Sequence, residues 1–364
     1  MLNSMHAYYF YRMFVTIGTI LLLHFLYLRL LMSKTQLIDN HGRPLRYLRL
    51  AVTDRCNLRC FYCMPEEGIN FTSKSKLLSY EEMERLVKIL AEMGIEKVRI
   101  TGGEPLVRKE IVPFMRRISD IENIQKVSIT TNGTFIEKFL PDFKEMNLEA
   151  INLSLDTLDK ERFFQITRRN EFDEVMASYR KIVESGIRTK INMVVMQEHN
   201  LADILPMCEL TRDDHVSVRF IEEMPFNGGN KLYQPVEWSI QKILKHIKDR
   251  FPELEKLEDE SGSTSYNYRI PGHKGTIGLI PAYTRTICGQ CDRIRITPQG
   301  VLKTCLYDNG RMNFRDMMRA GATDEELRNE FMKAFRSRTM DGFEAEKEAK
   351  NTSSSFQSMA TIGG

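Results

Sequence analysis

From residue 47 onward, short apolar runs rich in β-branched residues alternate with amphipathic stretches. The runs predict six strands, at 47–53, 97–101, 126–131, 150–155, 189–196 and 216–222. Strand, helix and strand recur about every 20 to 35 residues, which is typical of βαβ units in a parallel sheet. Six units are fewer than the eight of a closed barrel. The pattern therefore predicts an α/β fold, a partial (open) TIM-type barrel of about six βα units.

The stretch 79–94 shows how these units are delimited. Its apolar residues recur with helical spacing, Ser79 is placed to cap the first turn, and Glu82 is placed to complete a capping box. Gly94 stands where such a helix ends. In parallel α/β folds, ligands gather at the carboxyl ends of the strands. The loop that follows the first strand therefore lies on the ligand face.

The pattern changes after residue 225. A helical stretch at 237–251 and a polar linker at 258–265 precede shorter strand-like pieces, and another helix is expected near 323–335. No motif is recognised in 309–343, and the polar stretch 344–355 is expected to be mobile. We expect four regions: a leader (1–38), the partial barrel (44–225), a C-terminal domain (226–343) and a mobile tail ending in two glycines (344–364).

The leader 1–38 contains no Asp or Glu and holds an apolar run, 13–28, that ends at Arg29. A full membrane span needs about 20 apolar residues, so the run is slightly short. We expect a mitochondrial presequence and a place in the matrix, with a membrane anchor and membrane contact, or a cytosolic form started at Met32, as alternatives. A secretory signal is disfavoured because it would deliver the cysteines to an oxidising space.

Composition narrows the class of protein. The 364 residues are 42% hydrophobic and 28% charged, with a net charge of +3, too small to indicate a nucleic-acid partner. Six of the seven cysteines fall in two tight groups with metal-ligand spacing, which is unlike a secreted disulfide framework and indicates a reducing compartment. The seventh, Cys208, is expected to be a buried structural thiol.

The first cysteine group is Cys56, Cys60 and Cys63, directly after the first predicted strand. A structural zinc site uses four protein ligands, whereas each of the four irons of a [4Fe-4S] cluster needs one outside ligand. Three cysteines would leave one iron open to a substrate. A zinc site with a distant fourth ligand is the alternative, but the uneven spacing and the aromatic Tyr62 favour the cluster.

The second group is Cys288, Cys291 and Cys305, again three thiols where four would close a site. Between them, Arg293 and Arg295 alternate on a predicted strand and so point to one face. Two guanidinium groups beside an open iron favour an anionic or electron-rich ligand. The alternative is zinc, with His273 as the fourth ligand.

Two further patterns suggest ligand contacts. In "RITGGEPLVR" (99–108), two glycines let a small molecule approach the backbone, and Glu104 can accept from an ammonium group; a tight turn with a capping acid is the alternative. Basic residues on strands predicted to be buried are costly unless an anion lies inside the barrel. They are Arg49, Arg99, Lys190 and Arg219. A nucleoside triphosphate would satisfy them, and the sequence has no Walker P-loop.

Taken together, residues 44–306 and the closing glycines resemble the GTP 3',8-cyclases, radical S-adenosylmethionine (SAM) enzymes of the first step of molybdenum cofactor biosynthesis. The motifs that carry the resemblance are "LRLAVTDRCNLRCFYCMP", "RITGGEPLVR", "TTNGT", "NLSLDTL", "RFIEEMP" and "CGQCDRIRITPQG" with Cys305 and the final "GG". The resemblance implies the radical SAM fold with a C-terminal auxiliary-cluster region, and two [4Fe-4S] clusters. One is on Cys56, Cys60 and Cys63 and the other on Cys288, Cys291 and Cys305.

The resemblance also implies roles for single residues. SAM would be bound by Tyr62, Gly103, Glu104, Ser154 and Met224. GTP would be bound by Arg49, Arg99, Thr130, Lys190, Arg219, Arg293 and Arg295. The residues acting near the radical step would be Arg293, Arg295, Gly363 and Gly364, with the glycine tail inside the barrel.

The implied reaction begins when a 5'-deoxyadenosyl radical abstracts the C3' hydrogen of GTP. C3' then bonds to C8 to give 3',8-cyclo-7,8-dihydroguanosine triphosphate. The implied partners are an electron donor and a downstream cyclic pyranopterin monophosphate synthase, with no nucleic acid and with a homodimer left open. A radical SAM peptide maturase with an auxiliary cluster and a zinc-bound scaffold without activity are the competing functions.

Overall fold

The computed structural model describes residues 37–65, 68–224, 237–260, 262–351 and 357–363. The chain divides into two units, 1–36 and 37–364, and only the second contains described residues. The apolar run 13–28 therefore lies outside the described residues. Within the described ranges, no helix has the length and hydropathy needed to cross a bilayer.

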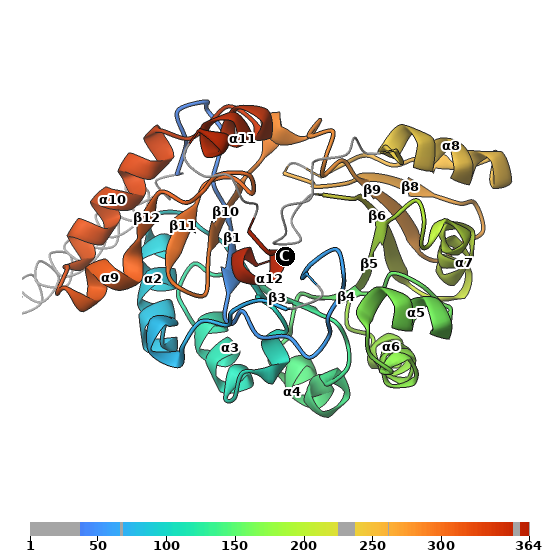
Figure 1. The fold of residues 1–364 in the computed structure, drawn as a ribbon, viewed down its shortest axis with the longest axis horizontal. Helices are drawn as coiled ribbons and strands as arrows, with labels where there is room; N and C mark the ends of the chain where they lie inside the picture. Colours follow the sequence, from blue (N-terminus) through green and yellow to red (C-terminus); the bar gives the residue numbers. More distant parts are fainter. Residues whose placement is uncertain (1–36, 66–67, 225–236, 261, 352–356, 364) are drawn as a thin grey trace, which may run out of the picture. The chain divides into compact units, whose positions relative to one another are not determined.

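Six parallel strands form the centre of one sheet, in the order of the sequence (Figure 1). They are β1 (Tyr47–Ala51), β2 (Lys97–Thr101), β3 (Lys126–Thr131), β4 (Ala150–Ser154), β5 (Thr189–Val195) and β6 (Val216–Glu222). The prediction of six strands is confirmed, with differences of at most two residues at their carboxyl ends. It succeeded because residues of opposite character alternate along strands such as β5, where every second residue is buried.

Six strands from the C-terminal half extend both edges of the sheet. β10 (Arg293–Ile296) pairs in parallel with β1, followed by β11 (Val301–Lys303) and β12 (Met312–Asn313). β9 (Thr276–Ile280) pairs in parallel with β6, followed by β8 (Tyr266–Arg269) and β7 (Glu255–Lys256). The strand order runs from β12 to β7 without closing, so the predicted open barrel is confirmed.

Helices cover the outer face of the sheet (Figure 1). They are α2 (Tyr80–Glu92), α3 (Ile111–Ser119), α4 (Leu140–Glu145), α5 (Lys160–Thr167), α6 (Phe172–Ser185), α7 (Ile204–Asp213), α8 (Ile240–Arg250), α9 (Phe314–Arg319) and α10 (Asp324–Arg336). In α2 the predicted capping box is present, with the Ser79 hydroxyl and the Glu82 carboxylate each accepting from the other residue's backbone N–H. One continuous apolar core fills the space between helices and sheet.

Part of the stretch expected to be mobile is helical. Residues Gly342–Lys350 form α11, whose first N–H groups are capped by the Asp341 carboxylate. The polar composition suggested disorder, but Ala345 is fully buried and Glu346 forms an ion pair of 2.5 Å with the buried Arg285. These tertiary contacts and the cap outweigh the low hydrophobicity. Residues 352–356 lie outside the described residues, and a short helix, α12 (Met359–Ile362), follows.

Candidate active site

Both cysteine groups line one cavity inside the open barrel. Its wall contains most of the predicted site residues, namely Arg49, Cys56, Cys60, Tyr62, Cys63, Arg99, Gly103, Glu104, Thr130, Ser154, Arg219, Met224, Cys288, Cys291, Arg293, Arg295 and Cys305. Lys190 and Gly363 are not part of that wall, and Gly364 lies outside the described residues. Positions separated by up to about 250 residues in sequence are thus brought to one surface by the parallel sheet.

The loop after β1 carries the first three cysteines. The backbone N–H groups of Cys63 and Met64 both donate to the carbonyl of Cys60, at 3.0 and 2.9 Å, which folds the loop tightly. Backbone hydrogen bonds from Arg59 and Phe61 to the end of α5 hold it against the barrel. The loop is therefore shaped by its own backbone and by α5.

Burial raises the pKa of Cys56 to about 12 and that of Cys63 to about 11. Metal ligation needs the thiolate, so these thiols suit a site where a bound cationic centre stabilises the deprotonated form. The neighbouring carboxylates of Glu104 and Asp156 are already engaged by protein donors. The residues present therefore fit a [4Fe-4S] cluster held by three thiolates with one iron open.

The two glycines of the "GGEP" turn lie against the cysteine loop. A Cβ on Gly103 would come within 2.3 Å of the Arg55 carbonyl oxygen, and a Cβ on Gly102 within 2.3 Å of the Thr53 carbonyl oxygen. The Gly103 N–H donates to the Thr53 carbonyl at 2.7 Å. Both glycines therefore allow the backbone of the cysteine loop to come close, and the predicted approach of a small molecule at Gly103, which lines the cavity, stays a prediction.

Glu104 joins the ends of neighbouring strands. Its carboxylate accepts from the Thr131 hydroxyl at 2.9 Å and from the backbone N–H groups of Asn132 and Leu106 at 2.7 and 3.0 Å. Burial raises its pKa to about 7, although these donors favour the charged form. All of these contacts lie within the protein, so Glu104 organises this end of the cavity.

Asp156 and Asn132 lie in the cavity wall but were not assigned a role from the sequence. The Tyr62 hydroxyl donates to Asp156 at 2.7 Å, and the Val194 N–H donates to its other oxygen at 2.8 Å. The Asn132 amide lies 3.8 Å from the Cys56 sulfur. Both residues belong to motifs quoted from the sequence, "NLSLDTL" and "TTNGT", which were the available signal.

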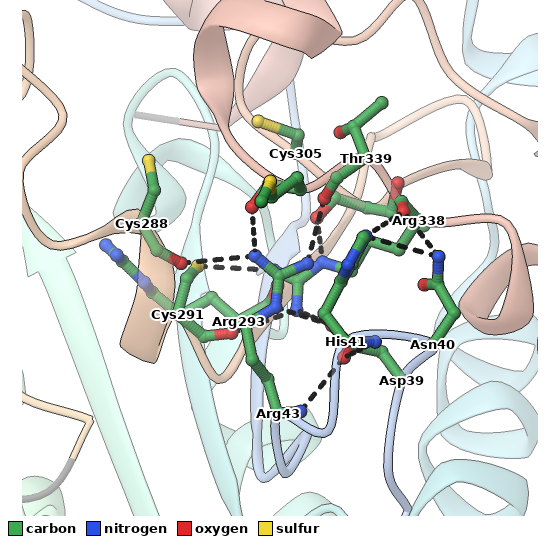
Figure 2. A network of polar contacts seen from close by, with 12 residues as sticks. Asp39, Asn40, His41, Arg43, Cys288, Cys291, Arg293, Cys305, Arg338 and Thr339 are labelled. Atoms are coloured by element: carbon green, nitrogen blue, oxygen red, sulfur yellow. Dashed lines mark hydrogen bonds and ion pairs between the residues drawn. The ribbon is translucent and has the colours of Figure 1, made fainter.

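The second cysteine group lies beside β10 and β11. Cys288 begins a short 3-10 helix, η5 (Cys288–Gln290), Cys291 follows it, and Cys305 comes two residues after β11. The Asp308 carboxylate accepts from the backbone N–H groups of Cys305 and Thr304, at 2.9 and 2.8 Å, and so fixes the turn that carries Cys305. Figure 2 shows the three thiols and the arginines next to them.

The second group differs electrostatically from the first. Burial raises the pKa of Cys305 to about 12, as for Cys56. Burial alone would also raise the pKa of Cys291, but the guanidinium groups of Arg293 and Arg338 lower it to about 6. A thiolate at Cys291 is therefore favoured by the protein itself.

His273 lies apart from the second cysteine group and so does not supply the fourth ligand that the zinc alternative requires. Its Nδ1 is 2.8 Å from the Thr211 hydroxyl, and its ring packs against Phe251. Among the described residues, no three His, Cys, Asp or Glu side chains form a group that would hold a single metal ion. The thiols that line the cavity at the second site are those of Cys288, Cys291 and Cys305.

Three arginines lie side by side across adjacent strands. Arg49 of β1 is directly opposite Arg295 of β10 on one side and Arg99 of β2 on the other. Burial, followed by the charges of Arg295 and Arg99, holds the pKa of Arg49 well below its usual value. The Nε atoms of Arg49 and Arg99 are buried and have no hydrogen-bond partner. Like charges in direct cross-strand pairs are destabilising, so this arginine row favours a polyanion.

Basic side chains on other strands of the sheet add to the positive charge of the arginine row. Burial and the Arg99 charge lower the pKa of Arg219 on β6 to about 10, and its Nε has no hydrogen-bond partner. Burial and the Arg219 charge lower the pKa of Lys190 on β5 to about 6. Lys190 follows the alternation of β5, so it shares a face with the cavity-lining Asn192. Thr130 also lines the cavity with an unpartnered hydroxyl.

The C-terminal tail reaches both ends of this arrangement. The Ser358 hydroxyl donates to the Cys63 carbonyl at 2.6 Å, and Arg295 donates to the Gly363 carbonyl at 2.9 Å. Gly363 has a φ of +79°, and a Cβ there would lie 2.8 Å from the Ala51 side chain. Figure 1 shows α12 on the inner side of the sheet, near β1. The tail therefore packs inside the barrel, between the first cysteine loop and the arginine row.

Comparison of the sequence with known proteins identifies two matching family models and several relatives. Residues 50–211 match the family model described as "Radical SAM superfamily", and residues 216–343 match "Molybdenum Cofactor Synthesis C". A Clostridium perfringens protein named "GTP 3',8-cyclase" is 40% identical over 80% of this chain and 89% of its own length. An Arabidopsis thaliana protein named "GTP 3',8-cyclase, mitochondrial" is 40% identical over 80% of this chain and 75% of its own length.

Longer proteins match over the same region. "Molybdenum cofactor biosynthesis protein 1" of Bos taurus is 42% identical over 80% of this chain, and the match spans 46% of that relative, about half its length. Among solved structures, Streptococcus suis SuiB bound to S-adenosylmethionine matches with a TM-score of 0.55 at 17% identity, over 79% of this chain and 69% of that one. That likeness concerns the fold alone.

Proposed function

The chain belongs to the GTP 3',8-cyclase family of radical SAM enzymes, and from this membership we propose that it converts GTP into 3',8-cyclo-7,8-dihydroguanosine triphosphate, the first step of molybdenum cofactor biosynthesis. The radical SAM family implies a [4Fe-4S] cluster and SAM. In the proposed reaction, GTP loses the C3' hydrogen atom to the 5'-deoxyadenosyl radical and C3' bonds to C8. The resulting nucleotide radical then takes up one electron from the electron donor and one proton at N7, which gives the 7,8-dihydro product.

Cys56, Cys60 and Cys63 would hold the first cluster, and Tyr62, Gly103, Glu104, Ser154 and Met224 would surround SAM. When bound, this cluster supplies the electron that splits SAM into methionine and the 5'-deoxyadenosyl radical. The residues of the chain itself would bind and orient SAM and GTP and shield the radical from water. Glu104 and Asp156 hold the surrounding loops through hydrogen bonds.

Cys288, Cys291 and Cys305 would hold a second [4Fe-4S] cluster, whose open iron would take the guanine. The two triplets line the same cavity, so one nucleotide can face both. The arginine row lies on the strands between them and would bind the triphosphate, together with Thr130, Lys190, Arg219 and Arg293. Joining two carbons of one molecule requires both of its ends to be held, which this layout would achieve.

The observation that carries the proposal is the arginine row. Three adjacent strands place like charges opposite one another inside a cavity, and two of the guanidinium groups have unpartnered Nε atoms. Such an arrangement costs stability without an anion. A nucleoside triphosphate supplies up to four negative charges in a shape that spans several strands.

The tail would complete the site. Arg295 donates to the Gly363 carbonyl, which supports a joint role for these two residues near the radical step. Arg293 and Gly364 would act there as well, as the family membership implies. Docking of the tail would exclude water from this end of the barrel and so protect a reactive intermediate. An electron donor and a synthase that consumes the product would be the partners. The location would be the mitochondrion, which the name of the Arabidopsis relative gives for that protein, and within it the matrix.

Deuterium transfer tests the proposal. The full chain, reconstituted anaerobically with iron and sulfide, is mixed with dithionite, SAM and GTP deuterated at C3'. We expect loss of GTP and one deuterium in the 5'-deoxyadenosine formed. The matched control is Cys208→Ala, which removes a thiol outside both groups and should leave both products unchanged. SAM cleavage with no loss of GTP would refute the proposed substrate.

A further inference from the structure

Arg338 lies at the end of the stretch 309–343, in which no sequence motif was recognised, yet it touches the second cysteine group directly. Its Nη2 lies 3.2 Å from the Cys291 sulfur. The side chain is 3% exposed, so this contact is shielded from water. Figure 2 shows the guanidinium group between the Cys291 segment and the turn at Asp39.

Every N–H of this guanidinium group has an acceptor. Besides the Cys291 sulfur, Nη2 donates to the Arg293 carbonyl at 2.9 Å, and Nη1 donates to the Cys291 carbonyl at 2.9 Å and to Asp39 at 3.0 Å. Nε donates to the Thr304 carbonyl at 3.0 Å, next to Cys305. Five donors in a rigid fork therefore tie together the backbone segments of two of the three thiols.

Arg43 holds the third segment in the same way. It donates to the Cys288 carbonyl at 3.1 Å and to the Thr339 carbonyl at 2.8 Å, and its Nε donates to Asp39 at 2.7 Å. Asp39, whose side chain is fully buried, thus lies between two guanidinium groups. Burial by itself would raise the pKa of Asp39, but hydrogen bonds from Arg43 and from the backbone of His41 hold it below its usual value.

Backbone contacts fix where Arg338 stands. The Arg338 carbonyl lies 3.0 Å from the Asn40 amide nitrogen, which donates to it, and 2.7 Å from Nε2 of His41. The turn 39–43 therefore locks both the main chain and the side chain of Arg338, as the dashed lines in Figure 2 mark.

The charges of Asp39, Arg43 and Arg338 do not balance one another. One carboxylate, that of Asp39, faces two guanidinium groups, and the surplus positive charge is directed at the Cys291 sulfur. A buried surplus charge is costly unless a negative group compensates it. A thiolate-ligated cluster is such a group, and its negative charge grows by one on reduction.

We propose that Arg338 is a positioning residue for the second cluster, which fixes the Cys291 ligand and stabilises the reduced state by donating a hydrogen bond to its sulfur. Hydrogen bonds to ligand sulfurs and net charge are among the factors that set the reduction potential of an iron–sulfur cluster. Loss of this hydrogen bond should therefore make the second cluster harder to reduce. The inference rests on the proposed function, because it requires a cluster on Cys288, Cys291 and Cys305.

The test isolates that cluster in the full chain by replacing Cys56, Cys60 and Cys63 with Ala. In this parent protein, Arg338→Gln removes the positive charge and three or more hydrogen-bond donors. Arg338→Lys keeps the charge but loses the planar set of guanidinium donors. Arg336→Gln is the control, at an exposed arginine two residues away. Iron and sulfide content, the far-ultraviolet circular dichroism of the iron-free protein and an electron paramagnetic resonance redox titration are measured on each.

We expect the iron-free proteins to share one fold. At a fixed potential, we expect the ratio of reduced to oxidised cluster in Arg338→Gln to be at least tenfold below that of the parent, a shift of about 59 mV for one electron. Arg338→Lys should fall between them, and Arg336→Gln should match the parent.

An unmoved midpoint potential in both Arg338 variants would overturn the inference. Loss of iron together with loss of the fold in both would also overturn it, since it would leave only a structural role. A parent that binds no iron on the second triplet would instead refute the second cluster and with it that part of the proposed function.

Discussion

Replacement of Gly103 by Ala tests how the first cysteine loop is held. The added Cβ would lie 2.3 Å from the Arg55 carbonyl oxygen and 2.9 Å from that of Asp54, and both are backbone atoms that cannot rotate away. Relief requires the turn and the loop to separate, which breaks the backbone hydrogen bonds from Gly103 to Thr53 (2.7 Å) and from Glu104 to Arg55 (2.8 Å).

The magnitude follows from these contacts. Overpacking costs about 1 to 3 kcal/mol, and each lost hydrogen bond costs about 1 kcal/mol more. A total of about 3 to 5 kcal/mol shifts the equilibrium between the docked and displaced loop by about a hundredfold or more. The thiols of the loop would then no longer share the geometry that one cluster needs.

The assay is iron and sulfide quantification after anaerobic reconstitution. The two proposed [4Fe-4S] clusters would contain about eight irons per chain, so Gly103→Ala should retain about four, all on the second triplet. Gly289→Ala is the matched control, because Gly289 lies between Cys288 and Cys291 and a Cβ there would meet nothing within 4 Å. A Gly103→Ala protein with the full iron content and unchanged SAM cleavage would refute this account of the loop.

Three further predictions follow from the tail and the basic groups. Gly363→Ala places a side chain at a φ of +79° and 2.8 Å from the Ala51 side chain, so the tail should undock and GTP turnover should fall at least tenfold. The control is Gly321→Ala, at a φ of +92° with nothing within 4 Å, which should not change turnover. Equal turnover rates for the two variants would contradict the docked tail. Arg49→Gln relieves repulsion in the arginine row, so the nucleotide-free protein should melt at a higher temperature. Calorimetry should find GTP binding at least tenfold weaker, a loss of about 1.5 to 3 kcal/mol of binding free energy. A lower melting temperature would argue against repulsion in the row. Burial and the Arg219 charge lower the pKa of Lys190 from 10.5 to about 6. Between pH 6 and 10.5 the unfolded chain therefore binds a proton at Lys190 that the folded chain does not bind. The stability of the folded protein falls as the pH is lowered through this range. Lys190→Met should therefore flatten the rise of the melting temperature from about pH 7 to 9, and an unchanged slope would count against the buried amine.

Much of this protein is encoded locally. Short apolar runs rich in β-branched residues, separated by amphipathic stretches, predicted all six central strands. The capping box at Ser79 and Glu82 formed as predicted because its partners are three residues apart. The cysteine spacings likewise indicated two three-thiol sites, because ligand number and spacing in a short loop are properties of the sequence itself.

Pairing across long sequence separations was decided only by the folded chain. The stretch around Arg338 shows no motif, but it meets Asp39 across 299 residues and contacts Cys291. The register of the parallel strands, rather than any pattern along one of them, puts Arg49 directly between two other arginines.

Local polarity was misleading where tertiary contacts dominate. The polar stretch is helical from residue 344 to Lys350 because Asp341 caps the helix and Arg285 pairs with Glu346. The glycines of "GGEP" face a neighbouring loop, which no sequence pattern identifies. Periodicity reports which face of an element is buried, but the partner that covers this face is chosen by packing and charge over the whole fold.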